Sequence, residues 1–371
     1  MLDFALINAK LLESARISAF LLEKSRQVQP VLWSALERTA EDWKDESSIV
    51  RQKIREAQAA HRYSGAIPAF ENPVESFTTD AQPLRVFGVD GSQIYPNEKS
   101  PVIWSYIQAI AYGVGDGIKY KAARFFTPLD LYSDGRLVSE EIINMRRNLL
   151  EMEVASLASQ QENNALVILD GALLPFASET ISHQEVQLIL SQYARCLFQS
   201  RLICGVISSP RSYLLNSLAC LALQAFCEHD QTEPPPLEEW KHAVTDRSFM
   251  NRLKVGERSA LFLYGSPRNE KFIHEGAGVY FFFLRIKSEE IVRVEIPEWV
   301  AKDADLVRAV HATVFHDSAM TGYSYALSQA HNNVVIPRDV ARQLQLKAER
   351  EMFSLTDDAY LPSAKDQFKT A

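Results

Sequence analysis

The feature that most constrains the fold of this chain is a pair of short apolar segments that each carry an aspartate followed by a glycine. The first is Val86–Ile94, with Asp90 before Gly91, and the second is Leu166–Leu173, with Asp170 before Gly171. A buried strand that ends in Asp-Gly places a carboxylate at its carboxyl edge, where the backbone turns sharply and a ligand can approach closely. The sequence therefore predicts two such strands.

Two aspartates placed in this way indicate a site for divalent metal ions. Hard cations take carboxylate oxygens, and a pair of metal ions about 3.5–4 Å apart can stabilise an in-line displacement at phosphorus. The residues by themselves leave an alternative open, because Asp-Gly after a strand also forms simple Asx turns.

The order of the elements around these aspartates favours one α/β architecture. We expect strands at 84–89, 102–112 and 118–126, a turn at 113–117, a helix from Ser139 to about 161, and a strand at 165–169 that leads to Asp170. Two Asp-bearing strands, separated by two antiparallel strands and a helix, are how ribonuclease-H-like folds begin. We therefore predict a ribonuclease-H-like mixed sheet flanked by helices. In that fold the intervening helix can supply a glutamate.

The predicted helix has an apolar stripe that faces the core and consists of Ile143, Leu150, Val154 and Leu157. Two glutamates, Glu151 and Glu153, flank this stripe on opposite sides. Either side chain could lean over the carboxyl edge of the sheet. We favour Glu151, because the small residues Ala155 and Ala158 on its side leave room for a metal ion.

Further candidates lie near the C-terminus of the chain. Tyr323 and His331 are eight residues apart, so they would share a face if the segment is helical. His331 would bind a metal ion or protonate a leaving oxygen. His311 and His316 are weaker alternatives.

Outside this region the sequence predicts further elements. A helix is expected at 178–199, strands at 202–207, 260–264 and 279–286, and helices after Pro297, the last of them beginning near Arg338. We divide the chain into an N-terminal helical extension (1–62), a connector (63–83), the main domain (84–345) and a C-terminal helix end and tail (346–371). The apolar spacing in 1–62 implies a buried face that mediates dimerisation or docking of a partner.

Composition excludes several classes of protein. The 371 residues are 47% hydrophobic and 23% charged, which is typical of globular proteins. The net charge of −8 argues against a simple nucleic-acid coat protein. Residues 241–271 carry seven bases and three acids, which is enough for a local phosphate-contacting face but is also compatible with an ordinary solvated surface. We find no apolar run long enough for a transmembrane helix and no signal peptide, so we expect a cytoplasmic protein.

The four cysteines lack zinc-site spacing and are expected to be free thiols.

With these residues assembled, the chain resembles the NurA nuclease family over roughly 84–345. The resemblance is carried, in the order of the family's motifs, by Asp90-Gly-Ser, the helix glutamate, Leu169-Asp-Gly-Ala-Leu173, and Tyr323 with His331. Segments around Arg247, Arg258 and Arg293 also look like stretches between the family's later motifs.

The resemblance implies a manganese-dependent (or Mg²⁺-dependent) nuclease of two-metal type that processes DNA ends in double-strand break repair. It implies 5′–3′ exonuclease and single-strand endonuclease action, a homodimer and a hexameric HerA-type ATPase as partner. Asp90, Glu151, Asp170 and His331 would hold the metals, and Tyr323 would orient substrate or water.

The chain departs from the family's pattern at two positions. Arg211 stands where the family often has a lysine, and Ser324 where it often has a proline. Arg211, with Arg247 and Arg258, is a candidate for contact with DNA phosphates. Lysine and arginine are not interchangeable, so the departures bear on phosphate contact and not on the proposed metal ligands.

Two other functions remain compatible with the residues. The chain would be a catalytically weak DNA-binding adaptor of a motor ATPase if the carboxylates do not converge. A phosphatase acting on small molecules would use the same strand ends. The basic 241–271 segment favours a polymeric phosphate over a small one.

Overall fold

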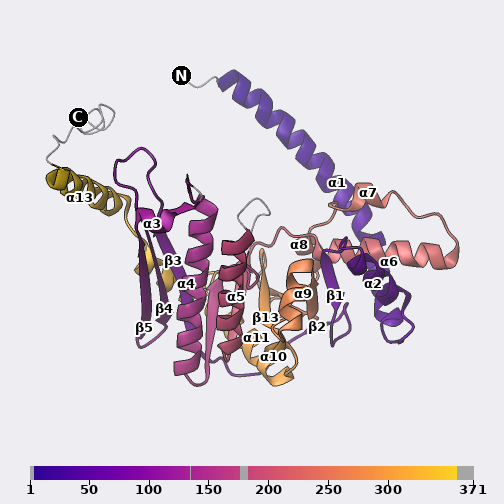
Figure 1. The fold of residues 1–371 in the computed structure, drawn as a ribbon. Coiled ribbons are helices and arrows are strands. Elements are labelled where there is room, and N and C mark those ends of the chain that lie inside the picture. The colour runs from indigo at the N-terminus through magenta and orange to yellow at the C-terminus, as the bar shows by residue number, and fades with distance from the viewer. Residues whose placement is uncertain (1–3, 134, 176–182, 357–371) are drawn as a thin grey trace. The chain divides into compact units, whose positions relative to one another are not determined.

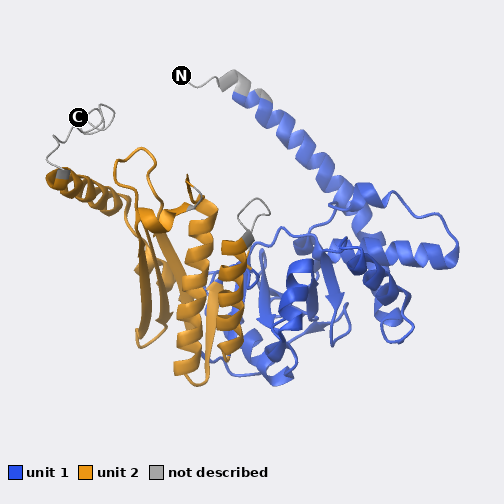
Figure 2. Cartoon of the chain, viewed as in Figure 1, with its two compact units in different colours: residues 1–85, 170–174, 202–325 blue, residues 86–169, 175–201, 326–371 orange. Residues whose placement is uncertain are grey.

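The computed structural model describes residues 4–133, 135–175 and 183–356, which form parts of two compact units (Figure 2). Unit 1 comprises Met1–Arg85, Asp170–Leu174 and Leu202–Tyr325, and unit 2 comprises Val86–Leu169, Pro175–Arg201 and Ala326–Ala371. The predicted helix start at Ser178 and the tail beyond Thr356 lie outside the described residues.

Unit 2 contains an antiparallel meander with a further strand added beside its first member. Its elements are β3 (Arg85–Ile94), β4 (Ser105–Gly113), β5 (Lys119–Phe126), α3 (Pro128–Leu131), β6 (Tyr132–Ser133), β7 (Arg136–Leu137), α4 (Glu140–Gln161), β8 (Ala165–Asp170), α5 (His183–Gln199), α12 (Tyr325–Val334) and α13 (Arg338–Thr356). The strand order is β8-β3-β4-β5, with β3–β4 and β4–β5 antiparallel. Along the chain, two antiparallel strands and a helix separate the two Asp-bearing strands, as the sequence predicts for a ribonuclease-H-like fold, and the predicted α/β class is confirmed.

Local sequence explains the start of α4, the helix that carries both candidate glutamates. The Ser139 side chain accepts a hydrogen bond from the Ile142 N–H, and Glu140 and Glu141 occupy the first turn, where the helix dipole favours negative charge. The helix packs on β4, β5 and α5, and Figure 1 shows α4 and α5 side by side. Its buried residues include Ile143, Leu150 and Val154, as the predicted stripe requires, whereas Leu157 is 45% exposed.

Unit 1 is built on its own antiparallel strands. Its helices are α1 (Phe4–Asp42), α2 (Ile49–Ala59), α6 (Leu214–Asp230), α7 (Leu237–Trp240), α8 (Asp246–Met250), α9 (Pro267–His274), α10 (Glu298–Ala301) and α11 (Ala304–Ser318), and its strands are β1 (Gly65–Pro68), β2 (Ser76–Phe77), β9 (Ile203–Ser208), β10 (Arg258–Ser259), β11 (Phe262–Gly265), β12 (Val279–Lys287) and β13 (Glu290–Pro297). The strand order is β1-β11-β12-β13-β9, and β10 pairs with β12 and β2. The segment expected to be a connector thus carries two short strands.

The core of unit 1 lies between these strands and helices α1, α2 and α6. Phe281 and Phe283 of β12 belong to this cluster together with Leu32, Leu36 and Leu218. Phe282, which points to the other face because side chains alternate along a strand, is near His311 of α11. Helices therefore cover both faces of the unit 1 strands.

Helix α1 divides into a packed half and an exposed half. Val28, Leu32 and Leu36 are at most 5% exposed, and α1 packs on α6. Toward the N-terminus the apolar side chains are instead turned to solvent, with Leu11 62%, Leu12 63%, Phe20 69%, Leu21 56% and Leu22 54% exposed. The buried face predicted from their spacing is therefore not buried within the described chain.

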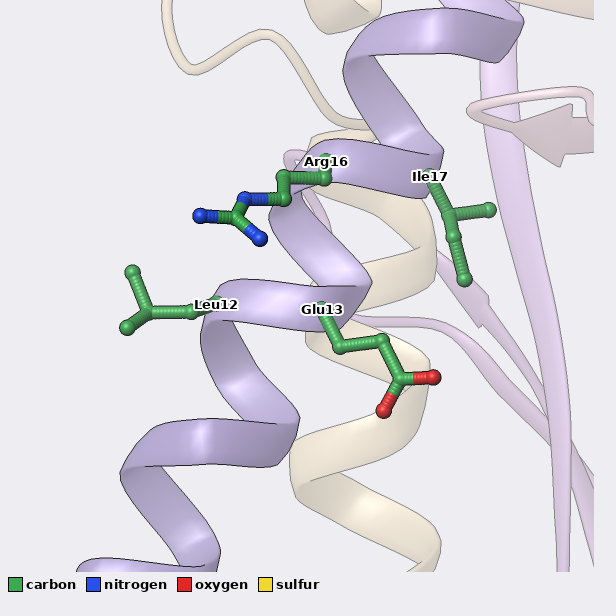
Figure 3. A pocket seen from close by; sticks show the side chains of 4 residues that line it. All are labelled: Leu12, Glu13, Arg16 and Ile17. Atoms are coloured by element: carbon green, nitrogen blue, oxygen red, sulfur yellow. The ribbon is translucent and has the colours of Figure 1, made fainter.

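Figure 3 shows this exposed half at close range. Leu12, Glu13, Arg16 and Ile17 line a hollow of about 410 Å³, and all four come from α1. Because one helix supplies these lining residues, the hollow is a surface between neighbouring side chains of α1.

The cysteines and the helices bear on two predictions made from composition. The four cysteines carry free thiols, with Cys204 and Cys220 buried. Within the described ranges, no helix combines the length and the apolarity needed to cross a lipid bilayer.

His311 gives the fold a stability that depends on pH. The ring is 1% exposed, its Nε2 lies 2.9 Å from the Gly256 carbonyl oxygen, and burial lowers its pKa to about 4. The unfolded histidine titrates near pH 6.5, so it binds more protons than the folded one between these values. We therefore expect the contribution of His311 to stability to be fully present above about pH 6.5, and about 3 kcal/mol of it to be lost as the pH falls toward 4. The free energy of unfolding of the wild type and of His311→Gln, measured between pH 7.5 and 4.5, tests this. An equally steep fall in the variant would contradict it.

Candidate active site

Asp90 lies inside a strand and not at a strand end. Strand β3 continues past it to Ile94, with Asp90 opposite Ile110 and Ile94 opposite Tyr106 of β4. The φ angle of Gly91 does not lie in the positive range. The predicted Asp-Gly turn is therefore wrong at this position, because cross-strand pairing with β4 keeps the backbone extended.

Gly91 has a different structural role, which is to make room for Glu151 of α4. A Cβ atom added at Gly91 would lie 2.3 Å from Oε1 of Glu151. The Glu151 side chain is only 12% exposed, and its Oε1 lies 3.1 Å from Nε of Arg147 one helical turn earlier. A carboxylate is thus held against the residue that follows Asp90.

Glu153 has other contacts. Both of its carboxylate oxygens accept hydrogen bonds from Arg124 of β5, at 2.8 and 2.7 Å. The preference for Glu151 over Glu153 remains a prediction, and the two environments support it, since Glu151 lies beside β3 at the position that follows Asp90.

His331 contacts Asp90 directly. Its Nδ1 lies 2.8 Å from Oδ2 of Asp90, with the side chains 64% and 17% exposed respectively. Helix α12 can bring His331 to this place because Gly88 has no side chain, and a Cβ there would lie 2.2 Å from the Ala326 carbonyl oxygen. The remaining oxygen of Asp90, Oδ1, accepts a hydrogen bond from the Gly91 N–H at 2.8 Å.

The second aspartate follows the sequence prediction closely. Strand β8 ends at Asp170, and Gly171 has φ +107°, a conformation that favours glycine. In unit 1 the Tyr323 hydroxyl donates to Oδ2 of Asp170 at 3.2 Å. Tyr323 precedes α12, which begins at Tyr325, so the condition for Tyr323 and His331 to share a helical face is not met.

These side chains have suitable chemistry for a divalent metal ion. Carboxylates and an imidazole suit Mn²⁺, and carboxylates suit Mg²⁺. Asp90, Glu151 and His331 belong to unit 2, and Asp170 and Tyr323 to unit 1. Among the described residues, no group of three or more His, Cys, Asp or Glu side chains is arranged to hold a metal ion. The types of donor atom fit a divalent metal ion, and two of the proposed ligands, Asp90 and His331, are in direct contact.

The candidate phosphate-binding arginines differ in their surroundings. Arg258 is 5% exposed, and its guanidinium is held by the Glu71 carboxylate and lies over the Phe77 ring, so the prediction that it contacts DNA is wrong. Arg247 donates to the Glu289 carbonyl oxygen. Arg211 is exposed and stays a candidate.

The predicted basic face over 241–271 is accordingly smaller than its charge count suggests. Besides Arg258, Arg252 lies over the Trp33 ring and donates to the Val74 carbonyl oxygen, and Lys241 pairs with Glu238. Several of these cations therefore make contacts within the fold, which a count of charges along the sequence cannot reveal.

A shallow hollow in unit 2 contains residues that the sequence did not single out. It measures about 280 Å³ and is lined by Tyr106, Gln108, Ala109, Ile110, Lys121, Ala122, Ala123, Asn333 and Val334. Asn333 and Val334 lie on α12, the helix that also carries His331. Alternating polar residues in β4 and β5 could have indicated this hollow in the sequence. Only the pairing of β4 with β5 brings these residues together.

The chain matches a protein family model and is similar to solved structures. The NurA domain family model matches residues 84–336. No curated protein matches the chain. A crystal structure of NurA is 12% identical, with 72% of this chain and 89% of that chain covered and a TM-score of 0.38. One of NurA bound to dAMP and manganese is also 12% identical, with coverage of 86% and 94% and a TM-score of 0.40.

A third similar structure is the catalytic domain of human endonuclease V. It is 13% identical, with 78% of this chain and 95% of that chain covered and a TM-score of 0.32. The similarity to all three structures is distant, so the family assignment rests on the sequence match over 84–336.

Proposed function

Because the chain belongs to the NurA family of nucleases, we propose that it hydrolyses phosphodiester bonds in DNA with a divalent metal cofactor, Mn²⁺ or Mg²⁺. The observation that carries this proposal is the contact of Asp90 with His331, with the Glu151 carboxylate held against the adjacent Gly91. The manganese and dAMP in the NurA crystal structure give the choice of metal and substrate further support.

In this proposal Asp90, Glu151, Asp170 and His331 hold the metal ions. When bound, two metal ions would activate water and stabilise the charge on the attacking and leaving oxygens. The contact with Asp90 orients the His331 ring, while Arg147 fixes the Glu151 carboxylate. Tyr323, which donates to Asp170, orients that carboxylate.

The proposal extends to how DNA is held. Arg211 and Arg247 contact phosphates, and the hollow beside α12 receives part of a DNA strand. In that hollow, Lys121 supplies a positive charge and Tyr106 an aromatic ring, the two groups that hold single strands without sequence preference. The reaction proposed is 5′–3′ exonuclease and single-strand endonuclease cleavage during end processing in the cytoplasm.

The direct test is cleavage of end-labelled single- and double-stranded DNA with Mn²⁺, Mg²⁺ or EDTA, beside an Asp170→Ala control. Metal-dependent cutting that the variant lacks would support the proposal, and the product ladder would give the polarity. Hydrolysis of a small phosphomonoester but not of DNA would instead indicate a phosphatase. If the protein cuts DNA neither alone nor with a HerA-type ATPase, the result would indicate a catalytically weak DNA-binding adaptor.

We further propose that the exposed half of α1 forms the contact between two copies of the chain, and that the dimer works with a HerA-type ATPase. Deleting residues 1–25 removes Leu11, Leu12 and Phe20 but keeps the packed residues from Val28 onward. We expect a dimer in the full chain and a monomer in the truncated one, by light scattering, with the melting temperature of the fold little changed. A truncated chain that stays dimeric would contradict this role, and loss of ATPase binding alone would assign α1 to the partner.

A further inference from the structure

A buried ion pair on β13 contacts the loop that carries Asp170. Arg293 and Glu295 are 8% and 0% exposed. One oxygen of Glu295, Oε2, accepts a hydrogen bond from the Leu173 N–H at 2.8 Å. The other, Oε1, accepts from Nε and Nη2 of Arg293 at 3.1 and 2.8 Å. Both oxygens of this carboxylate therefore face N–H donors, and one of the donors belongs to the Asp170 loop.

The loop 170–174 is fixed at further points in unit 1. The Gly171 N–H donates to the Val206 carbonyl oxygen at 2.9 Å, and the Leu173 side chain is fully buried. Gly205 of β9 leaves space for the loop, since a Cβ there would lie 2.5 Å from the Gly171 carbonyl oxygen. The backbone after Asp170 is thus closely packed, and Glu295 is its charged anchor.

Arg293 connects the same carboxylate to a second loop, the one that carries Arg211. Its Nη1 donates to Oγ of Ser212 at 2.8 Å. The Ser212 carbonyl oxygen accepts from the N–H of Asp246, and this buried aspartate accepts in turn from the N–H groups of Leu214 and Leu215, at the start of α6. One polar network therefore reaches from the Asp170 loop to the Arg211 loop.

We infer that Arg293 and Glu295 are positioning residues that hold the Asp170 carboxylate and the Arg211 segment in fixed places for the reaction. The inference rests on the proposed function, because positioning matters for cleavage only if Asp170 takes part in it. Neither residue needs to touch the substrate. Small displacements of a group that binds a metal ion or substrate are costly, and partners of ligating groups typically change affinity or activity by 10–100-fold when replaced.

Glutamine cannot replace Glu295 in this network. An amide has one accepting oxygen and an NH₂ group that only donates. Since donors face both sides of the carboxylate, Glu295→Gln would leave either the Leu173 N–H or Arg293 without its acceptor. The substitution keeps size and shape, so it tests the charge and the hydrogen bonds alone.

The chain offers a closely matched control in Glu71. This carboxylate likewise accepts two hydrogen bonds from a buried arginine, Arg258, and one from a backbone N–H, that of Leu261 at 2.8 Å. It lies in unit 1, where it contacts Arg258 of β10 and Leu261, which follows β10. Among the described residues, its hydrogen bonds do not involve the Asp170 loop. The Glu71 side chain is 21% exposed and that of Glu295 is 0% exposed, so Glu71→Gln should destabilise the fold in the same direction but less, without displacing Asp170.

The experiment compares the full chain with Glu295→Gln and Glu71→Gln, well below their melting temperatures. We expect Glu295→Gln to lower kcat for Mn²⁺-dependent DNA cleavage about tenfold or more and to raise the Mn²⁺ concentration for half-maximal rate. Glu71→Gln should change neither. Hydrogen exchange of the amides at 171–173 should accelerate in Glu295→Gln alone. If that variant does not fold, Ser212→Ala, which removes one acceptor of Arg293, should show the same shifts by a smaller factor.

Two results would overturn the inference: unchanged kcat and Mn²⁺ dependence in Glu295→Gln, or an equal loss in Glu71→Gln. The proposed function can fail separately. If the wild type does not cleave DNA, faster exchange at 171–173 in Glu295→Gln alone would still support the anchoring role, and unchanged exchange would refute it.

Discussion

Replacing Asp90 with asparagine is expected to abolish metal-dependent DNA cleavage, with a loss of at least about 100-fold in kcat. Asparagine has nearly the same shape but lacks the charge that a divalent cation requires of its ligand. The partner of Asp90, His331, is 64% exposed, and a pair that is open to solvent contributes little to stability. Cleavage of end-labelled DNA with Mn²⁺, measured beside thermal unfolding, separates loss of the site from loss of the fold.

Asp116→Asn is a suitable control for this variant. Asp116 lies in the turn between β4 and β5 of the same unit, is exposed, and accepts a hydrogen bond from the Ile118 N–H that asparagine can also accept. We expect it to cleave DNA at the wild-type rate. Cleavage by Asp90→Asn at the rate of this control would show that Asp90 does not hold the metal.

The second large effect is expected from Gly91→Ala, which alters no proposed ligand. The added methyl group would lie 2.3 Å from Oε1 of Glu151 and 2.9 Å from Cγ of Arg147. Both atoms belong to flexible side chains that can move, so the fold should survive with a melting temperature close to that of the wild type. The Glu151 carboxylate would be displaced by an ångström or more, and a shift of that size can lower kcat by about 100-fold.

The matched pair Glu151→Gln and Glu153→Gln shows whether the displaced carboxylate causes the loss. Glu153 lies two residues away on α4 but bonds Arg124. We expect Glu151→Gln to be as inactive as Gly91→Ala and Glu153→Gln to stay active, in the same Mn²⁺ cleavage assay. Full activity in Gly91→Ala, or inactivity confined to Glu153→Gln, would exclude Glu151 as the helix ligand.

Some parts of the candidate site were predictable because local sequence decides them. Asp170 ends β8 as expected, since Gly171 adopts the positive φ that the turn needs. The start of α4 follows from Ser139 and the acids after it. The resemblance to the NurA family also needed only the order of short motifs, and the family match over 84–336 confirms it.

Other parts depended on contacts between distant segments. The Asp90-Gly91 pair has the same local sequence signal as Asp170-Gly171, but pairing with β4 extends β3 through it. Arg258 was counted among the seven bases of the predicted basic face at 241–271, whereas Glu71 neutralises it in the interior. The segment around Arg293 was noted only for its resemblance to the family, and its sequence did not reveal a role for Glu295. That role depends on the amide of Leu173, more than one hundred residues earlier in the chain.

The sequence by itself determined the fold class, the order of most strands and helices, and the residue types available for metal and phosphate chemistry. Hydrophobic periodicity, capping residues and turn glycines act over a few neighbours, and they can be read along the chain. Tertiary structure alone decided that Gly91 accommodates Glu151, that His331 contacts Asp90, and that Arg293 and Glu295 anchor the loop after Asp170. These are pairings of charges and hydrogen-bonding groups across long sequence separations, and a buried polar group must find such a partner wherever the fold places one.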